Sequence, residues 1–206
     1  MLQVPSAQAQ EIVDQYRWLM VEVRRRTDVL DDILARKIPL PLMVAWELAQ
    51  LQIRKIAELI ALGALVAHGD VAGVRNAKLK KASQADYILN ALERLNPKFY
   101  PHPKMQTTGP DGERMVVDIT QPYLRKVDLI AAYRETGDAL HRGSISKITQ
   151  RWEPEPDMQG VSSFLSKTKV LLSEHWIQLQ DPRYVLVAIM VAQDGETHTT
   201  IMGLVE

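Results

Sequence analysis

The stretch that decides the fold is residues 42–68, which read LMVAWELAQLQIRKIAELIALGALVAH. Apolar side chains recur in it with the period of an α-helix, and Pro41 before it and Gly69 after it are typical helix boundaries. The most apolar segment, residues 56–67, is interrupted by Glu58 and is much shorter than the roughly 20 residues of a membrane span. The stretch therefore predicts a buried core helix.

A second long helix is expected on the N-terminal side, over residues 6–37. Its apolar residues recur at helical spacing, and they are Ile12, Tyr16, Leu19, Val23, Leu30 and Leu34. Pro39 and Pro41 separate it from the stretch above. We expect the two helices to form a long helical hairpin that is the backbone of the fold.

Two β-hairpins are indicated by turn residues between short strand-like segments. Their strands are expected over residues 104–108, 114–119, 184–193 and 197–205. The turns are Gly109-Pro110-Asp111-Gly112 and Asp194-Gly195. The first strand of the second hairpin is apolar on both faces, so we expect the other hairpin or a second subunit to cover it.

Three further helices are expected over residues 83–95, 123–141 and 161–179. Ser83 and Asp86 resemble a capping box, and Thr120 with Pro122 suggests a helix start. The expected fold class is α+β, mainly α: a helical bundle plus two hairpins that form one small antiparallel sheet. We expect one domain over residues 1–206, in which residues 161–206 are an addition to the helical part.

The composition excludes several functional classes. Among the 206 residues, Lys and Arg number 25 and Asp and Glu number 25, so no net charge attracts the whole chain to nucleic acid. The chain has no cysteine, which excludes disulfides, thiolate metal sites and cysteine nucleophiles. Residues 1–10 do not resemble a signal peptide. We expect a cytoplasmic protein with no membrane contact, metal or cofactor.

The helix predicted over residues 123–141 carries the strongest candidate site. Arg134 and His141 are seven residues apart, which places them on one side of a helix, about 20° out of line. Glu135 and Asp138 lie between them. Gly137 lowers helix stability by about 1 kcal/mol relative to alanine, which suggests close approach of a backbone or a ligand. The alternative is a solvated arginine and a histidine that interacts with the helix dipole.

A polar stripe runs along the apolar helix 42–68. Its members share one face at helical pitch, and they are Glu47, Gln50, Arg54, Glu58 and His68. Arg54 and Glu58 can pair at a spacing of four residues. Two interpretations stay open: the stripe is the solvent edge of the hairpin, or it faces Arg134 and His141 across a groove of the bundle.

These residues resemble the HEPN superfamily (higher eukaryotes and prokaryotes nucleotide-binding). The resemblance lies in the motif Arg134-Glu-Thr-Gly-Asp-Ala-Leu-His141, in which an arginine and a histidine are separated by six residues and Tyr133 precedes the arginine. The segments 51–62 and 68–70 are also similar to recurrent segments of bacterial members. The resemblance covers the helices, roughly residues 6–145.

The resemblance implies metal-independent RNA cleavage at a homodimer interface, as in toxin or defence proteins. His141 would transfer a proton and Arg134 would stabilise charge on the phosphate, with Glu135 or Asp138 orienting and Tyr133, Arg54, Glu58 and Glu47 supporting. RNA and an antitoxin or other protein are the implied partners. Glu135 stands where a neutral residue is more usual, and the alternative is a non-catalytic dimeric scaffold or partner-binding module.

A basic connector between the second and third helices is a separate candidate for nucleic-acid contact. Its cations are Arg75, Lys78, Lys80 and Lys81. Such a cluster can bind the phosphate backbone, whereas the alternative is a mobile, solvated connector. His68 and Asp70 lack a third ligand at recognisable spacing, so no metal site is expected there.

Overall fold

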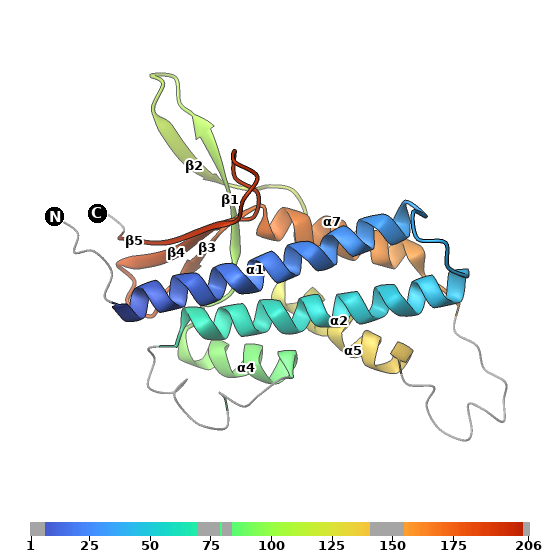
Figure 1. The fold of residues 1–206 in the computed structure, drawn as a ribbon. Coiled ribbons are helices and arrows are strands. Elements are labelled where there is room, and N and C mark those ends of the chain that lie inside the picture. Colours follow the sequence, from blue (N-terminus) through green and yellow to red (C-terminus); the bar gives the residue numbers. More distant parts are fainter. Residues whose placement is uncertain (1–6, 70–78, 80–83, 141–154, 204–206) are drawn as a thin grey trace.

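A computed structural model describes residues 7–69, 79, 84–140 and 155–203 (Figure 1). The fold is α+β and mainly helical, as predicted, with an antiparallel sheet on one side of a helical bundle. The helices are α1 (Ala7–Leu34), α2 (Leu42–Ala67), α4 (Ala85–Leu95), α5 (Lys126–Leu140) and α7 (Met158–Leu172). The strands are β1 (His102–Thr108), β2 (Arg114–Asp118), β3 (Glu174–Gln178), β4 (Tyr184–Ile189) and β5 (His198–Gly203). None of the described helices is long and apolar enough to cross a membrane.

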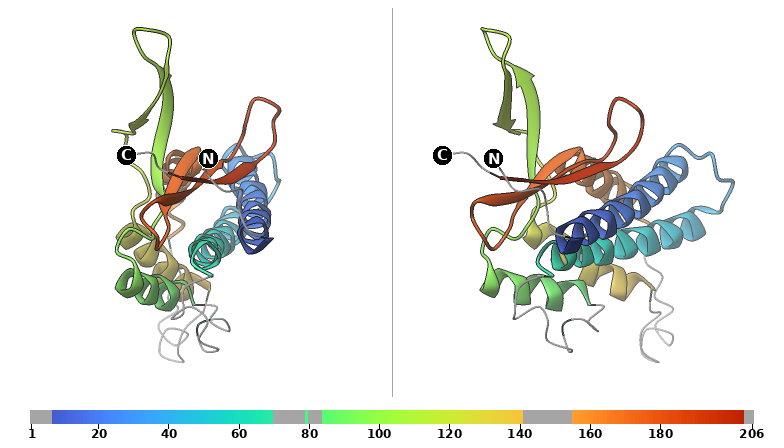
Figure 2. Two further views of the ribbon diagram at one scale, coloured as in Figure 1. Left: turned by 90° about the vertical axis from the view of Figure 1, so that its left-hand side faces the viewer. Right: turned by 60° about the vertical axis from the view of Figure 1, so that its left-hand side comes forward.

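Helices α1 and α2 form the expected long hairpin, in which they lie side by side and antiparallel (Figures 1 and 2). Ile53, Ile56 and Ile60 of α2 are almost fully buried in this core. At Gly63 a Cβ atom would lie only 3.1 Å from Cε2 of Tyr16, so a glycine allows the two helices their close approach. The hairpin is thus held by burial of one apolar stripe from each helix.

Helices α4 and α5 pack against α2 on the side away from the sheet, whereas α7 contacts α1, α2 and the sheet (Figure 1). Leu89 and Leu92 of α4 and Leu129 of α5 are fully buried. Helix α5 begins at Lys126, so the predicted start at Thr120 to Tyr123 was wrong. The preceding backbone is tied elsewhere, because Leu124 donates its N–H to the carbonyl of Lys167 in α7.

The strand order in the sheet is β2-β1-β3-β4-β5, and every neighbouring pair is antiparallel. Both predicted hairpins are present and belong to one sheet, which confirms that expectation. Strand β3 joins them, and it was missed: the helix predicted to Leu179 ends at Leu172. In residues 174–178 burial alternates, with His175 and Ile177 inside, which is the period of a strand.

One face of the sheet is covered by helices rather than by the other hairpin, since α1 contacts β5 and α7 contacts β3. Leu186 and Ala188 of β4 are buried in the same core as the helices. The hairpin β1–β2 extends away from the body of the molecule (Figures 1 and 2), and Met105, Met115 and Val116 on it are exposed.

Candidate functional site

Helix α5 presents one half of the predicted site to α2. Tyr133 is buried, and the guanidinium of Arg54 lies 4.4 Å from the centre of its ring. Arg54 also donates through Nη2 to the Tyr133 hydroxyl at 3.0 Å, and its Nε lies 3.4 Å from a carboxylate oxygen of Glu58. Arg54 therefore bonds to Tyr133 of α5 and to Glu58 of its own helix, and it joins α2 to α5.

The close approach expected at Gly137 is made by the same arginine. A Cβ atom at Gly137 would lie 3.5 Å from Nη1 of Arg54, an ordinary van der Waals separation, and apart from the adjacent residues and the backbone of α5 itself it would meet no other described atom within 4 Å. The neighbour is thus a side chain of the same molecule, not a backbone segment, and the geometry does not require glycine here.

Arg134 points to a different neighbour. Its guanidinium pairs with Asp86 of α4, with Nη2 at 3.2 Å from the carboxylate, and the Arg134 side chain is 65% exposed. It is bonded to neither Glu58 nor Glu135. Glu135 is exposed on the next position of α5. The solvent-accessible guanidinium can meet a phosphate, whereas Arg54 cannot without leaving Tyr133.

The remaining predicted residues divide into two groups. Glu47 of α2 is partly exposed, and within the described chain it forms no ion pair with Arg54 or Arg134. Outside the described residues lie His141, Arg75, Lys78, Lys80, Lys81 and the side chain of Asp138. In the described residues, Arg54 contacts Tyr133 of α5 and pairs with Glu58 of α2, whereas Arg134 pairs with Asp86 of α4, so the stripe does not meet Arg134 as one of the two interpretations required.

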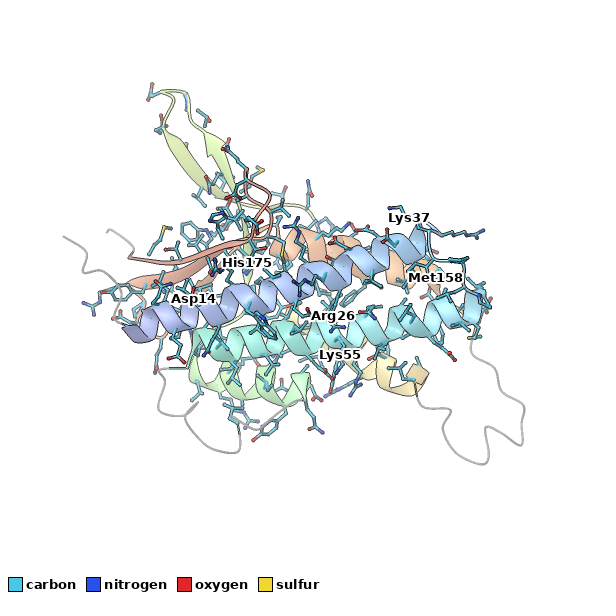
Figure 3. The ribbon with its side chains drawn as sticks, viewed as in Figure 1. Asp14, Arg26, Lys37, Lys55, Met158 and His175 are labelled. Carbon is cyan, nitrogen blue, oxygen red and sulfur yellow. The ribbon has the colours of Figure 1, made fainter. Side chains whose placement is uncertain are left out.

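The two buried histidines have structural partners. His175 of β3 lies where the sheet meets α1 (Figure 3), and its Nε2 is 2.6 Å from the hydroxyl of Tyr16. Burial lowers the pKa of His175 to about 4, so its ring is neutral near pH 7. Nδ1 of His68 lies 2.8 Å from the carbonyl oxygen of Ala64 and its Nε2 lies 3.0 Å from Nδ2 of Asn96, which joins the end of α2 to the chain after α4.

The sequence did not predict a cavity of about 690 Å³ that lies at the N-terminal end of α5. Its walls combine aromatic rings with cations, and the main contributors are Lys98, Tyr100, His102, Lys104, Tyr123, Arg125, Lys126 and Trp176. The signal that could have found it is the alternation of basic and aromatic residues in KFYPHPK (98–104) and YLRK (123–126). The mistaken helix start near Tyr123 concealed the second of these segments.

No protein-family model, curated protein or solved structure matches the chain. The described residues also contain no group of three or more His, Asp or Glu side chains that could hold a metal ion. The resemblance to the HEPN superfamily thus rests on the residues quoted above.

Proposed function

We propose that the protein is an RNA-directed, metal-independent endoribonuclease of the HEPN-like type, a cytoplasmic toxin or defence protein that acts as a homodimer. The observation that supports this proposal is the exposed guanidinium of Arg134. Its side chain is 65% exposed on α5, the helix whose last residue, Leu140, immediately precedes His141. A guanidinium in that position is accessible to a phosphodiester of an RNA strand.

The proposed reaction is an internal transesterification of RNA. A neutral His141 imidazole removes the proton of a ribose 2′-hydroxyl, whose oxygen attacks the adjacent phosphorus. Arg134 donates to the phosphate oxygens that gain charge. The bond to the 5′-oxygen of the next nucleotide breaks, and that oxygen receives a proton from imidazolium, leaving a 2′,3′-cyclic phosphate and a 5′-hydroxyl.

Asp86 is the group that a phosphate has to displace. The Arg134 side chain of this ion pair is 65% exposed and that of Asp86 is 28% exposed, so water reaches the pair and it contributes on the order of 1 kcal/mol. A phosphate that accepts two parallel hydrogen bonds from Arg134 offers a stronger contact. Glu135 opposes binding through its negative charge, but its exposure to water weakens this effect.

A second candidate function is a non-catalytic scaffold or partner-binding module. The observation that favours it is that Arg54 bonds both to Tyr133 of α5 and to Glu58 of α2, which gives Arg54 a structural role between the two helices. In this case α5 serves packing and partner contact, with an antitoxin or other protein as its partner.

Incubation of the purified protein with single-stranded RNA in the presence of EDTA separates the two candidates. We expect the wild type to cleave RNA to a cyclic phosphate product, His141→Ala to be inactive, and Arg134→Ala to lose at least about a hundredfold in rate. Arg17→Ala is the matched control, since Arg17 is also a half-exposed helix arginine beside a carboxylate, that of Asp14. Equal cleavage by the wild type and His141→Ala would refute the catalytic proposal.

A further inference from the structure

The cavity missed by sequence reasoning is formed by four separate parts of the chain. They are the continuous stretch 97–104, which leads from α4 into β1, the stretch 123–126 at the start of α5, strand β3 and strand β4. Tyr100 holds two of these parts together, because its hydroxyl donates to the carbonyl of Leu124 at 3.0 Å. The volume of about 690 Å³ lies within the range of roughly 300–1,000 Å³ typical of small-molecule sites.

Aromatic rings supply the apolar part of the wall. Tyr123 and Trp176 are both partly exposed, so neither ring is fully covered by the protein. The imidazole of His102 meets the Tyr123 ring edge to face, with centroids 6.0 Å apart and planes at 86°. The ammonium of Lys104 lies 5.8 Å from the centre of the Trp176 ring. Such rings offer faces on which a planar group can stack.

Cations supply the polar part, and the described lining contains no aspartate or glutamate. Three of the cations have a carboxylate partner: Lys104 has Asp118, Arg125 has Asp128, and Lys126 has Glu93. Lys98 is exposed and forms no ion pair within the described chain.

The balance of charge therefore favours an anion. The lining cations outnumber their carboxylate partners by one, four against three. Arg125 is itself 66% exposed, so its guanidinium can meet a ligand while it keeps Asp128. An anionic group would be held at Lys98 and Arg125, next to the aromatic wall.

We propose that this cavity binds a nucleotide, with its base stacked on Tyr123 or Trp176 and its phosphate held by Lys98 and Arg125. A ring system attached to an anion is the chemistry that the two parts of the wall share. Base stacking on aromatic side chains beside a basic surface is the general mode of single-stranded nucleic-acid binding. An acidic peptide without aromatic side chains would use the cations but would leave the aromatic wall without a stacking partner.

The cavity lies at one end of a row of α5 cations that reaches Arg134. The role given to this row rests on the proposed function. Lys126 pairs with Glu93 and Arg134 pairs with Asp86, so both cations point from α5 toward α4. They are eight residues apart on α5, a rise of about 12 Å along the helix. A single strand anchored in the cavity can continue along the α4–α5 seam and bring a later phosphate to Arg134.

The test measures binding of a short fluorescein-labelled 2′-O-methyl oligoadenylate by fluorescence anisotropy. This probe cannot be cleaved by attack of a 2′-hydroxyl, so binding is read without catalysis. We expect Tyr123→Ala to weaken binding at least about fivefold, whereas Tyr123→Phe, which keeps the ring, binds like the wild type. Trp18→Ala is the aromatic control, because Trp18 is 65% exposed on α1.

Lys98→Ala tests the phosphate contact without a change in the aromatic wall, and it decides the matter if Tyr123→Ala does not fold. We expect weaker binding and a slope of log K against log salt that is reduced by about 0.7. Lys37→Ala is the matched control, an exposed lysine in the α1–α2 turn (Figure 3). The proposal is wrong if Tyr123→Ala and Lys98→Ala both bind the probe as the wild type does.

Competition with adenosine 5′-monophosphate shows whether the cavity binds a free nucleotide or a nucleotide within an RNA strand. Displacement of the probe by millimolar nucleotide means that the cavity accepts free nucleotides, whereas Tyr123-dependent binding without displacement means that it needs a nucleotide within a chain. The cleavage assay separates this inference from the proposed function. If binding depends on Tyr123 but the protein does not cleave RNA, the cavity is a nucleotide site and the nuclease proposal is refuted. If the protein cleaves RNA but binding depends on neither Tyr123 nor Lys98, the nuclease proposal stands and the cavity proposal is refuted.

Discussion

At the scale of single residues, the buried pair of Tyr16 and His175 has the clearest physical consequence. The hydroxyl and the imidazole are 2.6 Å apart, and both residues are about 1% exposed or less. Burial raises the pKa of Tyr16 and lowers that of His175, because each charged form would lose its hydration. The pair is therefore a neutral hydrogen bond that joins α1 to β3.

This pair makes stability depend on pH. The pKa of His175 is about 4 in the folded protein and near 6.5 when unfolded, so the unfolded chain binds more protons between these values. The free energy of unfolding should therefore fall with decreasing pH, by about 2 kcal/mol between pH 7 and pH 5. Urea unfolding at both values measures this. In His175→Gln the fall should be smaller by that amount, and an unchanged fall would contradict the assignment.

Two helical glycines should respond in opposite directions to alanine. At Gly137 the new Cβ atom meets only Arg54 at 3.5 Å, so Gly137→Ala should raise the free energy of unfolding by up to about 1 kcal/mol. At Gly63 the Cβ atom would lie 3.1 Å from Tyr16, whose buried ring is held by His175. Gly63→Ala should therefore destabilise by about 1 kcal/mol or more. Thermal unfolding of both variants measures the two changes in stability. Destabilisation by Gly137→Ala would show that glycine is required there.

At the scale of elements, the α2–α5 contact explains the place of Arg54 in the polar stripe. Its centre is Arg54, which stacks on Tyr133, bonds to the Tyr133 hydroxyl and pairs with Glu58. A solvent-edge stripe would have no partner on α5. Neither of the two interpretations left open by the sequence describes Arg54 fully, because it contacts α5 through Tyr133 rather than Arg134.

A double-mutant cycle on Arg54 and Tyr133 measures this contact. Tyr133→Phe should cost about 0.5–1.5 kcal/mol, because it removes one hydrogen bond and keeps the ring. The coupling between Arg54→Ala and Tyr133→Phe should be about 0.5 kcal/mol or more, whereas residues without a shared contact add independently. RNA cleavage by Tyr133→Phe should equal that of the wild type. A zero coupling would show that the two side chains do not interact in solution.

Strand β3 shows how an element can be hidden in a sequence. Residues 161–179 were expected to be one helix, yet the helix ends at Leu172 and a strand begins two residues later at Glu174. A short segment with apolar residues at mixed spacing is ambiguous between the two periods. The strand conformation is stabilised by β1 and β4, which pair with the two edges of β3.

At the scale of the whole molecule, the proposal of a homodimer predicts a mass of about twice 23.3 kDa. Size-exclusion chromatography with light scattering measures it directly on the full chain. The expected result is one species near that mass at micromolar concentration, since paired active sites need two copies of Arg134 and His141. A monomer over the whole concentration range would contradict the dimeric form of the nuclease proposal.

Local patterns of sequence determined the α1–α2 hairpin, the two β-hairpins and the α+β class. These features depend on periodicity and on turn residues such as Asp194-Gly195, which act over a few positions. The sequence also indicated the pairing of Arg54 with Glu58, because charges on an apolar helix need partners.

Which groups meet depends on the packing of the helices and strands. Arg134 pairs with Asp86, 48 positions away, and the aromatic and basic wall of the cavity comes from segments as distant as Lys98 and Trp176. Strand β3 likewise depends on neighbours far along the chain. Such contacts depend on how the helices and strands pack in space, and the periodicity within any one of them carries no information about that packing.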